Sequence, residues 1–90
     1  MKYYTYILEC NDGTLYTGWT VDIDKRVLAH NGVGTKTGAK YTSARRPVKI
    51  VYQEECFGKS QAMKREIEIK KMTRVGKLGL INGNNHSIDL

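Results

Sequence analysis

The first stretch of the chain alternates residues that suit a pleated strand and then breaks at a turn. Its first arm, Tyr4 to Cys10, is rich in Tyr, Thr, Ile and Leu, which favour a half-buried strand. Asn11-Asp12-Gly13 follows. Because Asn and Asp tolerate left-handed backbone angles and Gly adopts them freely, this run indicates a tight turn. The second arm, Thr14 to Thr17, then returns beside the first, so the pattern predicts a β-hairpin.

Two tyrosines of this hairpin, Tyr6 and Tyr16, are expected to lie together. Simple hairpin pairing and a period of two can place both on one face. Gly18 is expected to end the second arm, at a point where a side chain would crowd whatever lies against the second tyrosine.

Two later segments show helical spacing. Asp22 to Asn31 predicts a helix, with Thr20 or Asp22 as its N-cap and Asn31-Gly32 as its stop. A longer helix is expected from Ser60, as N-cap, to about Val75.

Between these helices, Val48 to Phe57 alternates again and predicts a third strand. The fold class is therefore α/β (α+β): a small three-stranded antiparallel sheet flanked by helices, in the order ββαβα plus a short C-terminal helix from Lys77 to Ile81. We expect one domain over residues 1–82 and a flexible tail over residues 83–90.

Charge narrows the class of partner. The 90 residues carry 15 basic and 9 acidic side chains, a net charge of +6. A small protein this basic favours polyanions, and nucleic acid leads over an anionic membrane surface because no basic amphipathic helix stands out. The alternative is that the charge serves solubility alone.

The two cysteines, Cys10 and Cys56, do not have metal-ligand spacing. Both close predicted strands, so they could lie near each other, but we do not expect a disulfide. The sequence shows neither a signal peptide before the first strand nor an apolar run of membrane-spanning length. We therefore expect a cytoplasmic protein with reduced thiols and no membrane partner.

Three polar residues on the helices are candidates for chemistry. Arg26 and His30 are four apart and project from one helix face; the alternatives are a solvated arginine and a surface or capping histidine. Glu66 falls on the apolar side of the longer helix, one turn after Ala62 and three residues before Ile69. A carboxylate there needs a partner, which would be Arg26, a lysine, or a Mg²⁺ ion.

The segment from Asn31 to Pro47 combines glycines, basic residues and one aromatic. Glycines let backbone amides approach phosphates, basic side chains neutralise them, and an aromatic can stack on a base. The candidate nucleic-acid-binding residues are Lys36, Lys40, Tyr41, Arg45 and Arg46. The alternative is a flexible, solvated loop.

The hairpin carries a family resemblance. Tyr4-Thr5-Tyr6, followed ten residues after Tyr6 by Tyr16-Thr17-Gly18, resembles the paired motif of the GIY-YIG nuclease domain, with Tyr4-Thr5 standing where that motif has Gly-Ile. The chain is most similar to the small stand-alone GIY-YIG proteins of bacteria, mostly uncharacterised, which also resemble it at Lys40-Tyr41-Thr42 and Arg45-Arg46-Pro47. The resemblance covers about four-fifths of the chain.

The resemblance implies roles for five catalytic residues. Arg26, ten residues after Tyr16, would hold the scissile phosphate, and His30 resembles a histidine found in some members. Glu66 resembles the family's metal ligand and would bind one Mg²⁺ or Mn²⁺ ion. Either Tyr6 or Tyr16 would be the general base, with its pKa lowered by nearby cations.

Three functions follow as alternatives. The first is a divalent-metal-dependent endonuclease that cleaves phosphodiester bonds, with DNA as the substrate that the resemblance implies. The second is a non-catalytic nucleic-acid-binding module that retains the fold. In the third, the tyrosines and Glu66 are core residues of a domain that binds a protein. A lone domain this small lacks an obvious specificity module, so we expect either a structure-selective substrate or a protein partner that supplies specificity, and the sequence leaves the oligomeric state open.

Overall fold

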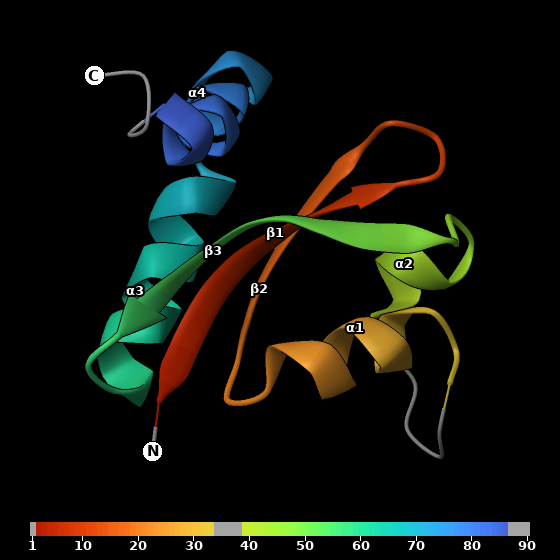
Figure 1. The fold of residues 1–90 in the computed structure, drawn as a ribbon, viewed down its shortest axis with the longest axis horizontal. Coiled ribbons are helices and arrows are strands. Elements are labelled where there is room, and N and C mark those ends of the chain that lie inside the picture. Colours follow the sequence, from red (N-terminus) through yellow and green to blue (C-terminus); the bar gives the residue numbers. More distant parts are fainter. Residues whose placement is uncertain (1, 34–38, 87–90) are drawn as a thin grey trace.

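The computed structural model of the chain describes residues 2–33 and 39–86. A three-stranded antiparallel sheet forms its centre, in the order β2-β1-β3, and helices cover both faces (Figure 1). This confirms the predicted fold class. The strands are β1 (Tyr3–Cys10), β2 (Leu15–Thr20) and β3 (Val48–Cys56), and the helices are α1 (Ile23–His30), α2 (Lys40–Ser43), α3 (Lys59–Lys70) and α4 (Arg74–His86).

The hairpin forms as expected, but its second strand is longer. Gly13 has a φ of +83° in the turn, where the Asp12 carboxylate accepts bonds from the amide and hydroxyl of Thr14 at 3.1 and 2.6 Å. β2 does not end at Gly18, because that residue stays paired opposite Tyr6 and the strand continues to Thr20. A glycine is needed at position 18 because a side chain would not fit there, and not because the strand ends.

The two sheet faces serve different helices. Tyr6, Leu8 and Cys10 point to one face and form a core cluster with Val48 against α1. Thr5 points to the opposite face, where its hydroxyl donates to the Ala62 carbonyl of α3 at 3.0 Å. In Figure 1, α1 and α2 accordingly lie on one side of the sheet, and α3 and α4 lie on the other.

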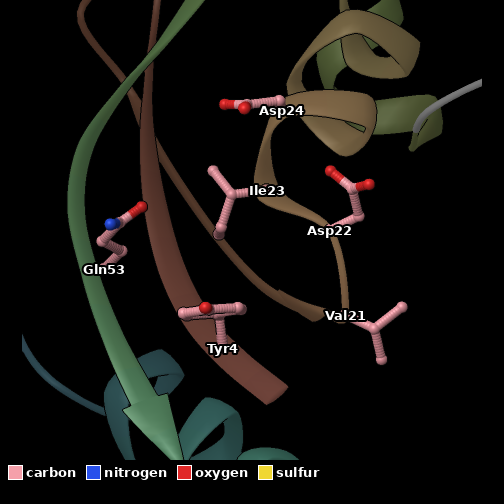
Figure 2. A pocket seen from close by; sticks show the side chains of 6 residues that line it. All are labelled: Tyr4, Val21, Asp22, Ile23, Asp24 and Gln53. Atoms are coloured by element: carbon pink, nitrogen blue, oxygen red, sulfur yellow. The ribbon is translucent and has the colours of Figure 1, made fainter. Parts of the chain in front are cut away.

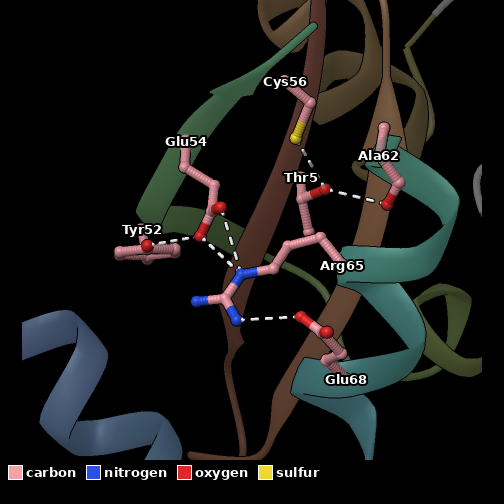
Figure 3. A network of polar contacts seen from close by, with 7 residues as sticks. All are labelled: Thr5, Tyr52, Glu54, Cys56, Ala62, Arg65 and Glu68. Carbon is pink, nitrogen blue, oxygen red and sulfur yellow. Dashed lines mark hydrogen bonds and ion pairs between the residues drawn. The ribbon is translucent and has the colours of Figure 1, made fainter. Parts of the chain in front are cut away.

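An ion-pair network fixes α3 against β3 (Figure 3). Arg65 donates through Nε to both carboxylate oxygens of Glu54, at 3.0 and 3.1 Å, and through Nη1 to Glu68 at 3.1 Å. The Tyr52 hydroxyl also donates to Glu54, at 2.5 Å. Burial lowers the pKa of Arg65, but its hydrogen bonds to Glu54 and Glu68 outweigh that effect and leave the pKa raised.

The second helical segment differs from its prediction. α3 begins at Lys59 with Gly58 as N-cap and without a side-chain cap, so Ser60 is not the cap. The expected single helix is interrupted at residues 71–73, where Thr73 Oγ1 accepts from the Gly76 amide at 3.1 Å and starts α4. α4 then continues through Asn82 to His86, where the sequence analysis expected a turn and a flexible tail.

The cysteines lie at opposite ends of the sheet, which contradicts the expectation that they might be neighbours. Cys56 pairs with Tyr3 and Cys10 pairs with Val48. Seven residue steps along β1 separate these pairs, a distance of about 23 Å. Both thiols are buried and free.

Candidate active site

Tyr6 and Tyr16 lie on the same sheet face, as predicted, with His30 of α1 between them. The Tyr6 hydroxyl is 2.9 Å from Nε2 of His30. The His30 ring packs edge-on against both tyrosine rings, with centroid distances of 6.1 Å to Tyr6 and 5.1 Å to Tyr16. A Cβ atom at Gly18 would lie 2.5 Å from the Tyr6 hydroxyl, so the predicted crowding is present, against the first tyrosine.

His30 is completely buried and held from its other side, so it is not the surface or capping residue of the alternative interpretation. Its Nδ1 lies 2.7 Å from the Thr42 hydroxyl and accepts from the Ala39 amide at 3.3 Å. A backbone N–H can only donate, so we assign Nδ1 as an acceptor and place the ring proton on Nε2. The Thr42 hydroxyl then donates to Nδ1 in place of the Ala39 carbonyl, which lies 2.9 Å from it. His30 then donates to the Tyr6 oxygen.

Burial and charge keep both partners of this pair neutral. Burial, followed by the charges of Arg26 and Arg46, lowers the pKa of His30 to about 4. Burial also raises the pKa of Tyr6 to about 12, against the lowering effect of Arg26, and the charges of Tyr16 and Glu66 add to the rise. The expected lowering of a tyrosine pKa is therefore not found for Tyr6 in the free protein.

Arg26 reaches the tyrosine site from α1. It is half-buried and close enough to lower the pKa of Tyr6 by direct contact and by charge. Among the ion pairs of residues 2–33 and 39–86, none includes Arg26. A guanidinium without a carboxylate partner at such a site is free to bind an anion.

Glu66 does not come from the face that carries the tyrosines, because α3 packs on the opposite face. It lies on the α3 side that buries Ala62 and Ile69, as predicted, and its side chain is 20% exposed. Its charge reaches Tyr6, whose pKa it raises. Lys70 pairs with it at 3.5 Å, which is the salt bridge to a lysine that the sequence left open.

Glu66 is the residue of the site that could hold a metal ion. No group of three or more His, Cys, Asp or Glu side chains suited to a metal occurs in the described part of the chain. A single carboxylate fits Mg²⁺, which is often held by one or two carboxylates and completes its shell with water and phosphate oxygens. The donor chemistry therefore fits a hard cation that arrives with its phosphate substrate.

The basic segment is more ordered than a solvated loop over the residues described. Tyr41 of α2 stacks on Tyr16 with a centroid distance of 5.8 Å, and the guanidinium of Arg45 lies 4.0 Å from the centre of its other face. Arg45 pairs with Asp12 of the hairpin turn at 3.1 Å, and Arg46 donates to the His30 carbonyl at 2.7 Å. Lys40 is exposed, and Lys36 lies outside the described residues.

Sequence reasoning missed three residues that build this site. Thr42 contacts His30, and Asp12 holds Arg45. Asn31 does more than stop α1, because its side-chain amide exchanges hydrogen bonds with the backbone of Val48 at 2.8 and 3.0 Å. The local signals of a turn or a helix cap can be read from the sequence. Contacts between residues that are 12 or more positions apart, as these three are, cannot.

A pocket of about 300 Å³ lies beside the site, between α1 and the sheet (Figure 2). Tyr4 and Gln53 line it from the strands. Asp22 and Asp24 line it from the start of α1, and Asp22 is the N-cap that accepts from the Lys25 amide at 3.1 Å. Its acidic rim does not suit a phosphate.

The comparison with known proteins decides the family. The model of the GIY-YIG catalytic domain matches residues 2–78. The chain belongs to the GIY-YIG family. This is a family of nucleases, so the expected family is confirmed and a nuclease-type hydrolase domain is indicated.

Proteins of similar length match this chain over most of their sequence. A UPF0213 protein of Syntrophus aciditrophicus is 58% identical over 83 residues, which cover 92% of this chain and 93% of that protein. A UPF0213 protein of Staphylococcus saprophyticus is 54% identical over 81 residues, 90% of this chain and 95% of the other. The solution structure of a UPF0213 protein from Bacillus halodurans matches with a TM-score of 0.57 at 38% identity, over 91% of this chain and 84% of that one.

A second solution structure, of a protein from E. faecalis, matches with a TM-score of 0.62 at 34% identity, over 94% of this chain and 88% of that one. The relatives are thus small bacterial proteins, as the sequence analysis expected. Within residues 2–33 and 39–86, no helix has the length and apolar character needed to cross a membrane.

Proposed function

We propose that this GIY-YIG protein is a divalent-metal-dependent endonuclease that hydrolyses phosphodiester bonds in nucleic acid, with DNA as the expected substrate. The observation that carries the proposal is the hydrogen bond between Tyr6 and His30, set beside Arg26 and within reach of the charge of Glu66. A polar pair buried in this way on a basic domain suits proton transfer at a phosphate more than it suits a passive core.

Arg26 would bind the scissile phosphate. Its guanidinium lacks a carboxylate partner among the described residues, and it can form paired hydrogen bonds with two phosphate oxygens. The same charge would stabilise the additional negative charge that develops as water attacks.

Tyr6 would accept the proton of the attacking water. His30 Nε2–H donates to the phenol oxygen in our assignment, and a donor there stabilises the phenolate, as the charge of Arg26 also does. Because the pKa of Tyr6 is about 12 in the free protein, the phenol must first release its own proton to solvent when substrate and cation lower that pKa, and the phenolate then takes the proton of the attacking water. Tyr16, which packs against His30, would position the ring and line the site.

Glu66 would hold one Mg²⁺ or Mn²⁺ ion, whose chemistry is to polarise the phosphate and offset charge on the leaving oxygen. Lys70 would have to leave its present contact with Glu66. Its side chain is 50% exposed, so it can turn outward to a phosphate at little cost.

The test is cleavage of labelled single-stranded, duplex, flap and branched DNA, and of RNA, with Mg²⁺ or Mn²⁺. Glu66→Gln should reduce cleavage by about a hundredfold or more while binding changes little. Glu68→Gln is the matched control, since Glu68 lies on the same helix but bonds Arg65, and it should cleave normally. Equal cleavage by the wild type and Glu66→Gln would refute the proposed site.

A second function has one specific observation in its favour. The high pKa of Tyr6 would suit a module that binds nucleic acid without cleaving it. If this second function is correct, the protein should bind nucleic acids of the panel but cleave none of them with Mg²⁺ or Mn²⁺. Its binding should be the same in Glu66→Gln.

A further inference from the structure

Three aromatic residues and a lysine belong to one end of the sheet: Tyr3 begins β1, Trp19 lies one residue before the end of β2, and Phe57 and Lys59 follow the end of β3. The strand ends meet there in Figure 1. We name Tyr3, Trp19, Phe57 and Lys59 the aromatic platform. We propose that this platform stacks on unpaired nucleotides of the substrate strand and holds them beside the active site. The proposal rests on the nuclease function above and names a further binding surface and the kind of nucleic acid that it recognises.

Phe57 is the strongest single indication. Its side chain is 98% exposed, whereas an aromatic residue next to a strand normally contributes to a core. Its backbone is nevertheless held, because its amide donates to the Gln61 side chain at 2.6 Å. A large apolar ring is therefore presented to solvent on a fixed backbone.

The neighbours of Phe57 form a partly exposed aromatic pair with a cation. Tyr3 and Trp19 have ring centroids 6.3 Å apart, and the ammonium of Lys59 lies 5.8 Å from the Trp19 ring centre. Tyr3 pairs with Cys56, the residue before Phe57. Aromatic faces combined with a lysine are the features that bind single strands, since rings stack on bases and the cation neutralises a phosphate.

The platform is continuous with the proposed catalytic site along α3. Lys59 and Glu66 are seven residues apart and so lie on one side of the helix, two turns or about 10 Å from each other. This distance corresponds to about three stacked nucleotides. Met63, at 42% exposure, projects between them on the same side of the helix, so a strand whose phosphate reaches Glu66 would pass directly to the platform.

Charge favours a nucleic acid over a protein or a second copy of the chain as the occupant. α3 carries four basic and two acidic side chains, and Arg65 alone among its basic residues is neutralised by a carboxylate of the sheet. A second copy would bring the same positive surface against this one. Duplex DNA hides its bases in the stack, so the aromatic rings require unpaired nucleotides.

Trp19 is the only tryptophan of the chain, so its fluorescence reports on the platform directly. We would titrate a short oligothymidylate into the Glu66→Gln protein without a divalent cation, so that no cleavage occurs, and repeat this with a blunt-ended DNA duplex. The single strand should quench Trp19. Phe57→Ala should weaken that binding about five- to a hundredfold and leave duplex binding unchanged.

Matched variants separate stacking from general effects. Phe57→Tyr should bind like the parent, whereas Phe57→Leu, which is apolar but lacks a ring, should behave like Phe57→Ala. Val75→Ala removes another apolar side chain that is 79% exposed and should have no effect. Because Phe57 has lost almost no surface to the fold, its variants should keep the parent's circular dichroism and melting temperature.

Two results would overturn the platform. One is equal affinity of Phe57→Ala and its parent for oligothymidylate. The other is a dimer that Phe57→Ala converts to monomers without a change in oligonucleotide binding, which would assign the surface to a second copy. Neither depends on catalysis, so the absence of cleavage by the wild type would refute the nuclease function and leave this binding test intact.

Discussion

The hydroxyl of Tyr6 lies 2.9 Å from Nε2 of His30, although one belongs to the central strand and the other to the last turn of α1. Both side chains are buried in the free protein. Each therefore satisfies the other's polar group, and the loss of either leaves an unpaired buried atom, which costs about 1–3 kcal/mol.

His30→Ala and His30→Gln should have different effects on activity. Alanine removes the donor to Tyr6 and leaves a cavity, so the free energy of unfolding should fall by about 2–4 kcal/mol and kcat by about a hundredfold. Glutamine carries an amide donor at a similar distance from the backbone. The kcat of His30→Gln should therefore be about tenfold higher than that of His30→Ala. Steady-state cleavage and chemical denaturation would measure both, and equal kcat values for the two variants would refute the donor role of His30.

The lowered pKa of His30 also predicts how stability depends on pH. Its pKa is 6.5 in the unfolded chain and about 4 in the folded protein, so between these values the unfolded state binds more protons. Stability should be fully present above pH 6.5 and fall by on the order of 2 kcal/mol as the pH drops to about 4.

Denaturation at a series of pH values would test this, with His30→Gln as the control. Carboxylates titrate in the lower part of the same window in both proteins, so the difference between the two curves isolates His30. A wild-type curve that runs parallel to that of His30→Gln between pH 6.5 and 5 would contradict the assignment.

Local patterns were sufficient for most of the fold. The alternation of β1 and β3 and the turn at Asn11-Asp12-Gly13 depend on neighbours in sequence, and both were predicted from the sequence. The cap of α1 was predicted as Thr20 or Asp22, and the structure has Asp22. The end of α3 was not, because Thr73 starts α4 by bonding Gly76, and a threonine inside an otherwise helical pattern is a weak signal. Gly18 was wrongly predicted to end the strand. A glycine is required at that position because Tyr6 lies close to it across the hairpin.

The candidate site could be predicted as a set of residues but not as an arrangement. Spacing and family resemblance identified Tyr6, Arg26 and Glu66. They did not show that Glu66 comes from the helix on the opposite sheet face, since helix placement follows from contacts such as that between Thr5 and Ala62. Nor did sequence indicate the raised pKa of Tyr6, whose cause is burial.

Arg45 offers a test between two roles, nucleic-acid contact and support of Tyr41. Its guanidinium plane covers the Tyr41 ring, and its charge pairs with Asp12. Arg45→Lys keeps the charge but loses the planar contact. If support dominates, Arg45→Lys and Arg45→Ala should both reduce kcat/KM about two- to fivefold without changing the salt dependence of binding.

If Arg45 instead contacts a phosphate, only Arg45→Ala should weaken binding, and the slope of log affinity against log salt should fall by about one. Lys49→Ala is a suitable control for both variants. It removes another exposed basic residue with one carboxylate partner, Glu9 at 3.4 Å.

Gly18→Ala tests the close approach of β2 to Tyr6. The added Cβ would lie 2.5 Å from the Tyr6 hydroxyl and 3.3 Å from a ring carbon of Tyr16, and the Tyr6 ring is held in the core at 1% exposure. We expect a loss of about 1–3 kcal/mol in the free energy of unfolding, together with loss of cleavage as Tyr6 shifts from His30. Gly79→Ala is the opposite control, because nothing lies within 4 Å of its added Cβ and alanine favours a helix by about 0.5–1 kcal/mol. Chemical denaturation should therefore move the midpoints of the two variants in opposite directions, and a Gly18→Ala protein as stable and active as the wild type would show that the tyrosine site tolerates displacement.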